Sequence, residues 1–181
     1  MQRRHLLGLL GVAGLGAVAT SYWRLPLAAA PAALTLPAAM QLLERLAQAS
    51  LHSVAGWPPA MVFNHCAQSV DYSIDGYPQL KPAWFRHTAG PLAFSVFAAR
   101  GAMRHPLDEA IPGAPELNEP GEVRVALARL QLAFARFAAH RGRLAAHFAY
   151  GELSHDEYAL AHVLHLYNHL ALLRANGQPI A

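Results

Sequence analysis

Three histidines near the C-terminus, His162, His165 and His169, have a spacing that suits metal binding. Residues three, four and seven positions apart share one face of an α-helix, so the three imidazoles lie on one stripe. Neutral imidazole is a good ligand for zinc, nickel, iron or copper, and the i, i+4 pair His165 and His169 can share one ion. The alternative is that these rings are buried and hydrogen-bonded to carbonyls or water, because an unpartnered buried polar group costs about 1–3 kcal/mol.

A third metal ligand must come from another helix, and His65 is the best candidate. Gln68, Asp71 and Tyr72 follow one and two helical turns later, where they could orient a ligand or contact a substrate. His162 could hydrogen-bond to a ligating ring, since ligating histidines usually donate their other N–H to a neighbour. Together these residues predict a site with three histidine ligands on two helices.

Two further residues each have two interpretations. His147 either lines the same pocket or caps a turn. Cys66 adjoins His65, but neighbouring residues on a helix point about 100° apart, which favours a small core residue over a nucleophile–base pair. As the single cysteine, Cys66 also excludes an internal disulfide and a cysteine-based zinc or iron–sulfur site.

Hydrophobic periodicity predicts helices as the elements that carry these residues. The expected helices cover 37–53, 58–74, 82–101, 122–140 and 154–176. An interruption is expected at Gly90-Pro91, and Ser154 with Glu157 fits a capping box at the start of the last helix. No strand and no internal repeat is predicted, so the fold class is an all-α bundle in one domain over 35–177.

Residues 1–30 are expected to form a twin-arginine-like signal peptide and linker. Arg3-Arg4 precede His5-Leu6-Leu7 and about 14 mostly apolar residues, an order typical of exported proteins. Cleavage would release the protein into the periplasm, whereas an uncleaved segment would anchor it in the inner membrane. A third alternative is a buried helix of the fold.

The charge balance argues against a nucleic-acid partner. The 181 residues are 54% hydrophobic and 14% charged, with a net charge of +3. The low charged share excludes a disordered chain, because such chains cannot bury enough apolar surface. Removal of residues 1–19 takes away Arg3 and Arg4 and leaves +1, so much of the positive charge belongs to the predicted export signal.

Spaced motifs along the chain carry a family resemblance. They are Asn64-His65-Cys66-Ala67-Gln68-Ser69-Val70-Asp71-Tyr72-Ser73, Gly76-Tyr77-Pro78, Ile111-Pro112-Gly113-Ala114-Pro115, His147-Phe148-Ala149-Tyr150-Gly151 and the segment from Ala161 to Leu170. Over about 37–173 the chain resembles a bacterial family of unknown function, domain of unknown function 1569, within the DinB-like superfamily.

The resemblance implies a four-helix bundle of DinB-like type with up-down-down-up connectivity, often as a homodimer. Many members of that superfamily hold a divalent metal with one histidine of the second helix and a His-x-x-x-His pair on a late helix. That pattern falls on His65, His165 and His169, with zinc, nickel or iron as the implied ion. Leu170-Ala171-Leu172 stands where many members have another histidine and an Arg-Gly-Gln run.

Three classes of function follow, and whether the chain is an enzyme stays open. The first is a metal-dependent thiol transferase or hydrolase that acts on a small molecule or thiol, as the resemblance implies. The second is a non-catalytic protein of the cell envelope that binds a metal or a small ligand. The third is a structural bundle whose histidines are satisfied internally.

Overall fold

Helices account for most of the computed structural model, which describes residues 34–117 and 121–180. The six helices of these residues are α2 (Leu36–Leu46), α3 (Pro59–Asp75), α4 (Ala83–His87), α5 (Ala89–Arg100), α6 (Val123–Ala139) and α7 (His155–Leu170). The signal peptide and linker predicted for 1–30 lie outside the described residues. None of the helices in the described ranges is long and apolar enough to cross a membrane.

The predicted helices at 58–74 and 122–140 are confirmed as α3 and α6, with ends within a residue or two of those expected. The helix expected over 82–101 is instead two helices, α4 and α5, which meet at Thr88. Pro91 does not break α5, because it stands in the first helical turn, where the missing N–H costs no intrahelical bond.

The predicted absence of strands is wrong. Strand β1 (Leu51–Ser53) pairs antiparallel with β2 (Leu173–Ala175), and β2 pairs antiparallel with β3 (Gln178–Pro179). The first and last expected helices therefore end early, at Leu46 and Leu170. For the last helix, the physical reason lies in Asn176-Gly177, whose φ angles of 51° and 81° suit a two-residue hairpin loop between β2 and β3.

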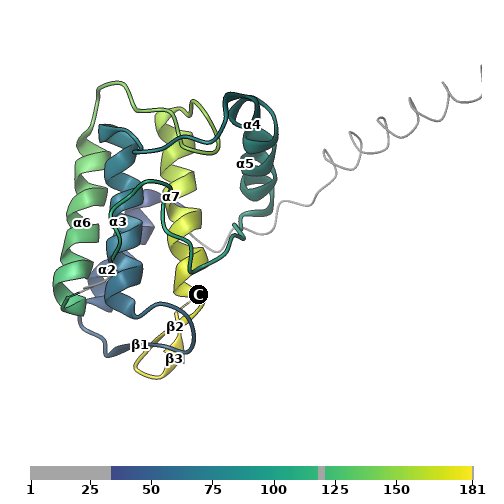
Figure 1. Ribbon diagram of the computed structural model, residues 1–181. Coiled ribbons are helices and arrows are strands. Elements are labelled where there is room, and N and C mark those ends of the chain that lie inside the picture. The colour runs from purple at the N-terminus through teal and green to yellow at the C-terminus, as the bar shows by residue number, and fades with distance from the viewer. Residues whose placement is uncertain (1–33, 118–120, 181) are drawn as a thin grey trace, which may run out of the picture.

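The core lies among α2, α3, α6 and α7. Figure 1 shows α3 beside both α6 and α7, with α4 and α5 on the far side of α7 and the small sheet at the end of the helices. Fully buried side chains from these helices include Leu43, Phe63, Leu130, Phe134 and Leu166. Each contributes about 1.5–3 kcal/mol of hydrophobic stabilisation, so the packing holds α3 and α7 at a fixed separation.

The start of α7 is fixed by the predicted capping box. The Ser154 hydroxyl accepts a hydrogen bond from the Glu157 N–H at 3.2 Å, and the Glu157 carboxylate accepts one from the Ser154 N–H at 2.8 Å. The box satisfies two backbone donors that the first turn of the helix leaves free. It therefore sets the register from which His162, His165 and His169 project.

Candidate metal centre

Three histidine rings from two helices converge between α3 and α7. His65 projects from α3, and His165 and His169 lie one turn apart on α7. Nε2 of His165 is 3.2 Å from Nε2 of His65 and 3.1 Å from Nε2 of His169. One donor atom from each of the three rings lies within 4.8 Å of the other two, so the group could hold a metal ion.

Hydrogen bonds between the rings do not account for this arrangement. A ring nitrogen carries either one hydrogen or one lone pair in the ring plane, so Nε2 of His165 cannot satisfy both neighbours at once. A metal about 2.0–2.1 Å from two nitrogens separates them by about 2.9 Å at a right angle and about 3.3 Å at the tetrahedral angle. The observed 3.1 and 3.2 Å fall between these values.

Burial keeps the three rings in the form that binds metals. Burial, and then the nearby His105, lower the pKa of His65 to about 4. Burial also lowers the pKa values of His165 and His169, and the neighbouring imidazoles lower them further. At pH 7 all three rings are therefore neutral and have lone pairs to offer.

Trp57 forms one wall of the triad formed by His65, His165 and His169. Its ring stacks on His169 at a centroid distance of 6.1 Å and meets His65 edge-on at 5.0 Å. The backbone carbonyl of Trp57 accepts a hydrogen bond from the hydroxyl of Ser53, the last residue of β1. The small sheet thereby positions an apolar ring that restricts how the two histidines can turn.

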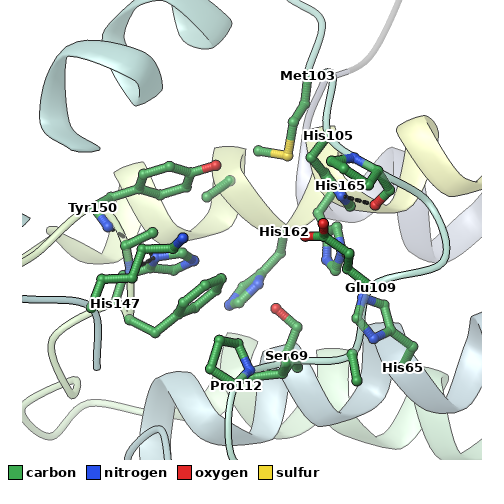
Figure 2. Close-up of a pocket in the computed structure, with 17 residues that line it drawn as sticks. His65, Ser69, Met103, His105, Glu109, Pro112, His147, Tyr150, His162 and His165 are labelled. Atoms are coloured by element: carbon green, nitrogen blue, oxygen red, sulfur yellow. Dashed lines mark hydrogen bonds between the residues drawn. The ribbon is translucent and has the colours of Figure 1, made fainter. Parts of the chain in front are cut away.

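A cavity of about 280 Å³ opens beside His65 and His165. Its walls come from α3, α7, the loop over 103–112 and the segment 147–150, as Figure 2 shows. Apolar side chains such as Met103 and Ile111 line much of it, and polar atoms come from Ser69, histidines and Glu109. A cavity of this kind suits a small organic molecule.

His147 and His162 both line this cavity. Nδ1 of His147 accepts hydrogen bonds from the N–H groups of Ala149 and Tyr150, each at 3.1 Å. His147 therefore caps a turn, and its ring also forms part of the cavity wall. His162 is 3% exposed, and its Nε2 has no hydrogen-bond partner among the described residues. That buried nitrogen therefore lacks the partner that such a group normally has.

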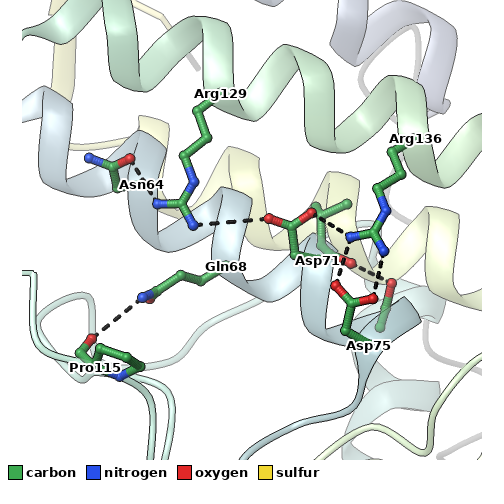
Figure 3. Close-up of polar contacts among 9 residues, drawn as sticks. Asn64, Gln68, Asp71, Asp75, Pro115, Arg129 and Arg136 are labelled. Carbon is green, nitrogen blue, oxygen red and sulfur yellow. Dashed lines mark hydrogen bonds and ion pairs between the residues drawn. The ribbon is translucent and has the colours of Figure 1, made fainter.

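Gln68, Asp71 and Tyr72 do not line the cavity. Figure 3 shows Asp71 facing α6, where Arg136 donates to it at 3.2 Å. At 100° per residue, Asp71 stands about 120° around α3 from His65, which explains why it points elsewhere.

The other two residues of this set have structural contacts of their own. The Gln68 amide donates to the Pro115 carbonyl at 3.4 Å, and the Tyr72 ring packs on Tyr77. These contacts hold a loop and the end of α3 in place near the cavity, but neither side chain forms part of the cavity wall.

Two residues at the site could not be found from sequence spacing. His105 stands in the loop, with its ring centroid 5.0 Å from that of His165, and Trp57 precedes α3. No helical period places a loop residue, so only the folded chain reveals them. Cys66 is 2% exposed within the hydrophobic core, and burial raises the pKa of its thiol. That surrounding agrees with the core interpretation.

The comparisons with known proteins support one assignment. Residues 33–176 match the model of a family described as "Protein of unknown function (DUF1569)". Neither the curated proteins nor the solved structures gave a match. Because the family match spans well over half of the 181 residues, the chain belongs to this DUF1569 family.

Proposed function

We propose that His65, His165 and His169 bind one divalent metal ion and that the adjacent cavity brings a small molecule to it. The observation that carries the proposal is the convergence of three Nε2 atoms at 3.1 and 3.2 Å, with contacts that hydrogen atoms cannot all satisfy. Zinc, nickel and iron all accept a donor set of neutral imidazoles, and the sequence contains no rival cluster of cysteines.

The proposed activity is a metal-dependent thiol transfer or hydrolysis. Three protein ligands leave coordination positions open, and a bound metal lowers the pKa of a water or thiol held there. The walls of the cavity offer apolar contacts to the substrate, and Ser69, His147 and His162 offer hydrogen-bonding groups to orient it. The resemblance to the DinB-like superfamily supports the choice of reaction class. The alternative is a non-catalytic protein of the cell envelope, which would bind the metal or a small ligand without converting it.

The same resemblance supports a four-helix bundle, and α2, α3, α6 and α7 are the four helices we assign to it. They are the helices whose buried side chains form the main core. The homodimer and the small-molecule or thiol partner stay predictions, as does export through the twin-arginine-like segment to the periplasm or inner membrane.

A zinc titration tests the proposal. We expect the chelator-treated wild-type protein to bind one zinc ion per chain in competition with a chromophoric chelator. His165→Ala removes the nitrogen that contacts both of its neighbours, so we expect its affinity to fall by at least about 100-fold, beyond the 10–100-fold typical of outer hydrogen-bond partners. The exposed His87 provides the control, because His87→Ala leaves the site intact. Absence of stoichiometric zinc binding by wild type would refute the proposal.

A further inference from the structure

His105 stands beside the triad with a lone pair that nothing in the described residues uses. Its Nδ1 lies 2.6 Å from the carbonyl oxygen of Pro106. A carbonyl can only accept, so this hydrogen bond requires the proton on Nδ1. Nε2 of a neutral His105 therefore has a lone pair, and this atom is buried without a partner.

The ring of His105 lies next to the rings of two triad histidines. Its centroid is 5.0 Å from that of His165 and 5.1 Å from that of His169. Figure 2 shows His105 next to His165, on the loop that crosses the cavity, with His65 below them. A histidine whose one nitrogen is fixed by a backbone carbonyl while the other is free has the arrangement typical of metal-ligating histidines.

A purely structural role explains the Nδ1 contact but not the Nε2 atom. Pinning of the loop needs the hydrogen bond to Pro106 only, and it would leave a buried acceptor unsatisfied at a cost of about 1–3 kcal/mol. A water molecule could satisfy this nitrogen, but it would occupy the space beside the triad that the cavity opens to. A single metal ion could accept this lone pair together with the lone pairs of the three triad imidazoles.

We propose that His105 is a fourth, exchangeable metal ligand, which closes the coordination of the ion until a small molecule displaces it. The inference rests on the proposed function, since it needs an ion at His65, His165 and His169. Nε2 of His105 is not among the donor atoms that lie within 4.8 Å of one another. Its loop must therefore shift towards the triad when the ion binds, and a loop residue can do so more easily than a residue on a packed helix.

The test uses Co²⁺ in place of zinc, because its visible absorption reports coordination number. Four-coordinate Co²⁺ absorbs far more strongly than five- or six-coordinate Co²⁺. We expect a strong four-coordinate spectrum in the full chain and a clear loss of intensity in His105→Ala. We also expect the variant to bind Co²⁺ at least about tenfold more weakly, since even partners outside the ligand set are worth about 10–100-fold. His87→Ala is the matched control.

Added imidazole sharpens the comparison. It enters the position vacated in His105→Ala and restores the intense spectrum, whereas wild type needs a much higher concentration because His105 competes. A second readout is trypsin cleavage after Arg104, which Co²⁺ slows in wild type but not in His105→Ala if the ion holds the loop. Circular dichroism of each variant verifies that it is folded.

The outcomes separate the two proposals. If wild type and His105→Ala bind Co²⁺ with the same affinity and spectrum and respond alike to imidazole, His105 is not a ligand and the three-histidine site stands. If wild type binds no Co²⁺ and no zinc, the proposed function fails and this inference falls with it.

Discussion

Burial governs the chemistry of single histidines around the cavity. His147 and His162 are 7% and 3% exposed, and burial is the main cause that lowers both of their pKa values, that of His162 to about 3. Both rings are neutral at pH 7 and present polar atoms to the cavity without carrying charge. These two rings therefore add no charge to that of Lys81 and Glu109, which also line the cavity.

We expect the metal-free protein to lose stability as the pH falls below about 6.5. In the unfolded chain a histidine has a pKa of about 6.5, whereas His162 in the folded protein has a pKa of about 3. Between these values the unfolded state binds the proton and the folded state does not. Each such histidine therefore lowers the free energy of unfolding by about 1.4 kcal/mol per pH unit, and the full stability returns above pH 6.5.

Urea denaturation of chelator-treated protein at pH 7.5, 6.5, 5.5 and 4.5 (on the order of one pH unit apart, to match the slope above) measures this dependence. His162→Gln removes one depressed histidine, so its stability is expected to fall less steeply with pH than that of wild type. His87→Ala, at an exposed position that does not line the cavity, is the matched control. Equal slopes for wild type and His162→Gln would show that His162 takes up its proton in the folded state.

The residues of the site differ in how far sequence predicts them. The pair His165 and His169 follows from helical spacing alone, because the helix itself places both rings on one face. Their approach to His65 depends on how α3 packs against α7, which the motif resemblance supplied and spacing could not. His105 and Trp57 lie outside any period, so their places depend on loop and sheet contacts between distant segments.

At the scale of elements, the helices with a clear apolar stripe were predictable and the sheet was missed. α3 and α6 follow their periodicity closely, because burial of one face selects the helix. The strands are only two or three residues long, which is too short to show an alternation of apolar and polar residues. The Asn176-Gly177 pair was the local signal of the hairpin. The same pair is also typical of a helix C-terminus, so it did not distinguish a hairpin from the end of a helix.

A glycine in α5 provides the test at this scale. Replacement of a helical glycine by alanine normally stabilises a helix, by up to about 1 kcal/mol. A Cβ at Gly90, however, would lie 1.8 Å from the backbone carbonyl oxygen of Ala149, which lines the cavity. We therefore expect Gly90→Ala to destabilise the protein by about 1–3 kcal/mol, measured by urea denaturation, because neither backbone can move without a shift of the whole segment.

Ala89→Gly is the matched control for Gly90→Ala. Ala89 is exposed at the start of α5, so its loss of helix propensity is expected to cost no more than about 1 kcal/mol. If Gly90→Ala were as stable as wild type or more stable, α5 would not lie in close contact with the 147–150 segment.

At the scale of the whole molecule, the net charge depends in part on the predicted export signal. The net charge of +3 includes Arg3 and Arg4. Some of the arginines of α6 form ion pairs with neighbouring carboxylates. Arg136 is engaged with Asp71 and Asp75, and it lowers the pKa of the Asp75 carboxyl. Exposed ion pairs of this kind contribute at most about 1 kcal/mol to stability.

Replacement of the paired arginines tests the predicted export. We expect the full chain to reach the periplasmic or inner-membrane fraction of a host with a twin-arginine pathway, and Arg3→Lys with Arg4→Lys to retain it in the cytoplasm although the charge is unchanged. Fractionation with immunoblotting measures the distribution. Equal export of the two forms would show that the arginine pair is not read as an export signal.

X-ray absorption at the zinc edge tests the central claim most directly, because it counts and identifies the ligands of a bound ion. For the zinc-loaded wild-type protein we expect a shell of nitrogen ligands at about 2.0–2.1 Å, with the outer scattering of at least three imidazole rings and no sulfur at about 2.3 Å. His165→Ala is expected to lose the bound zinc. A shell of oxygen or sulfur ligands, or zinc bound equally well by His165→Ala, would contradict a metal centre at His65, His165 and His169.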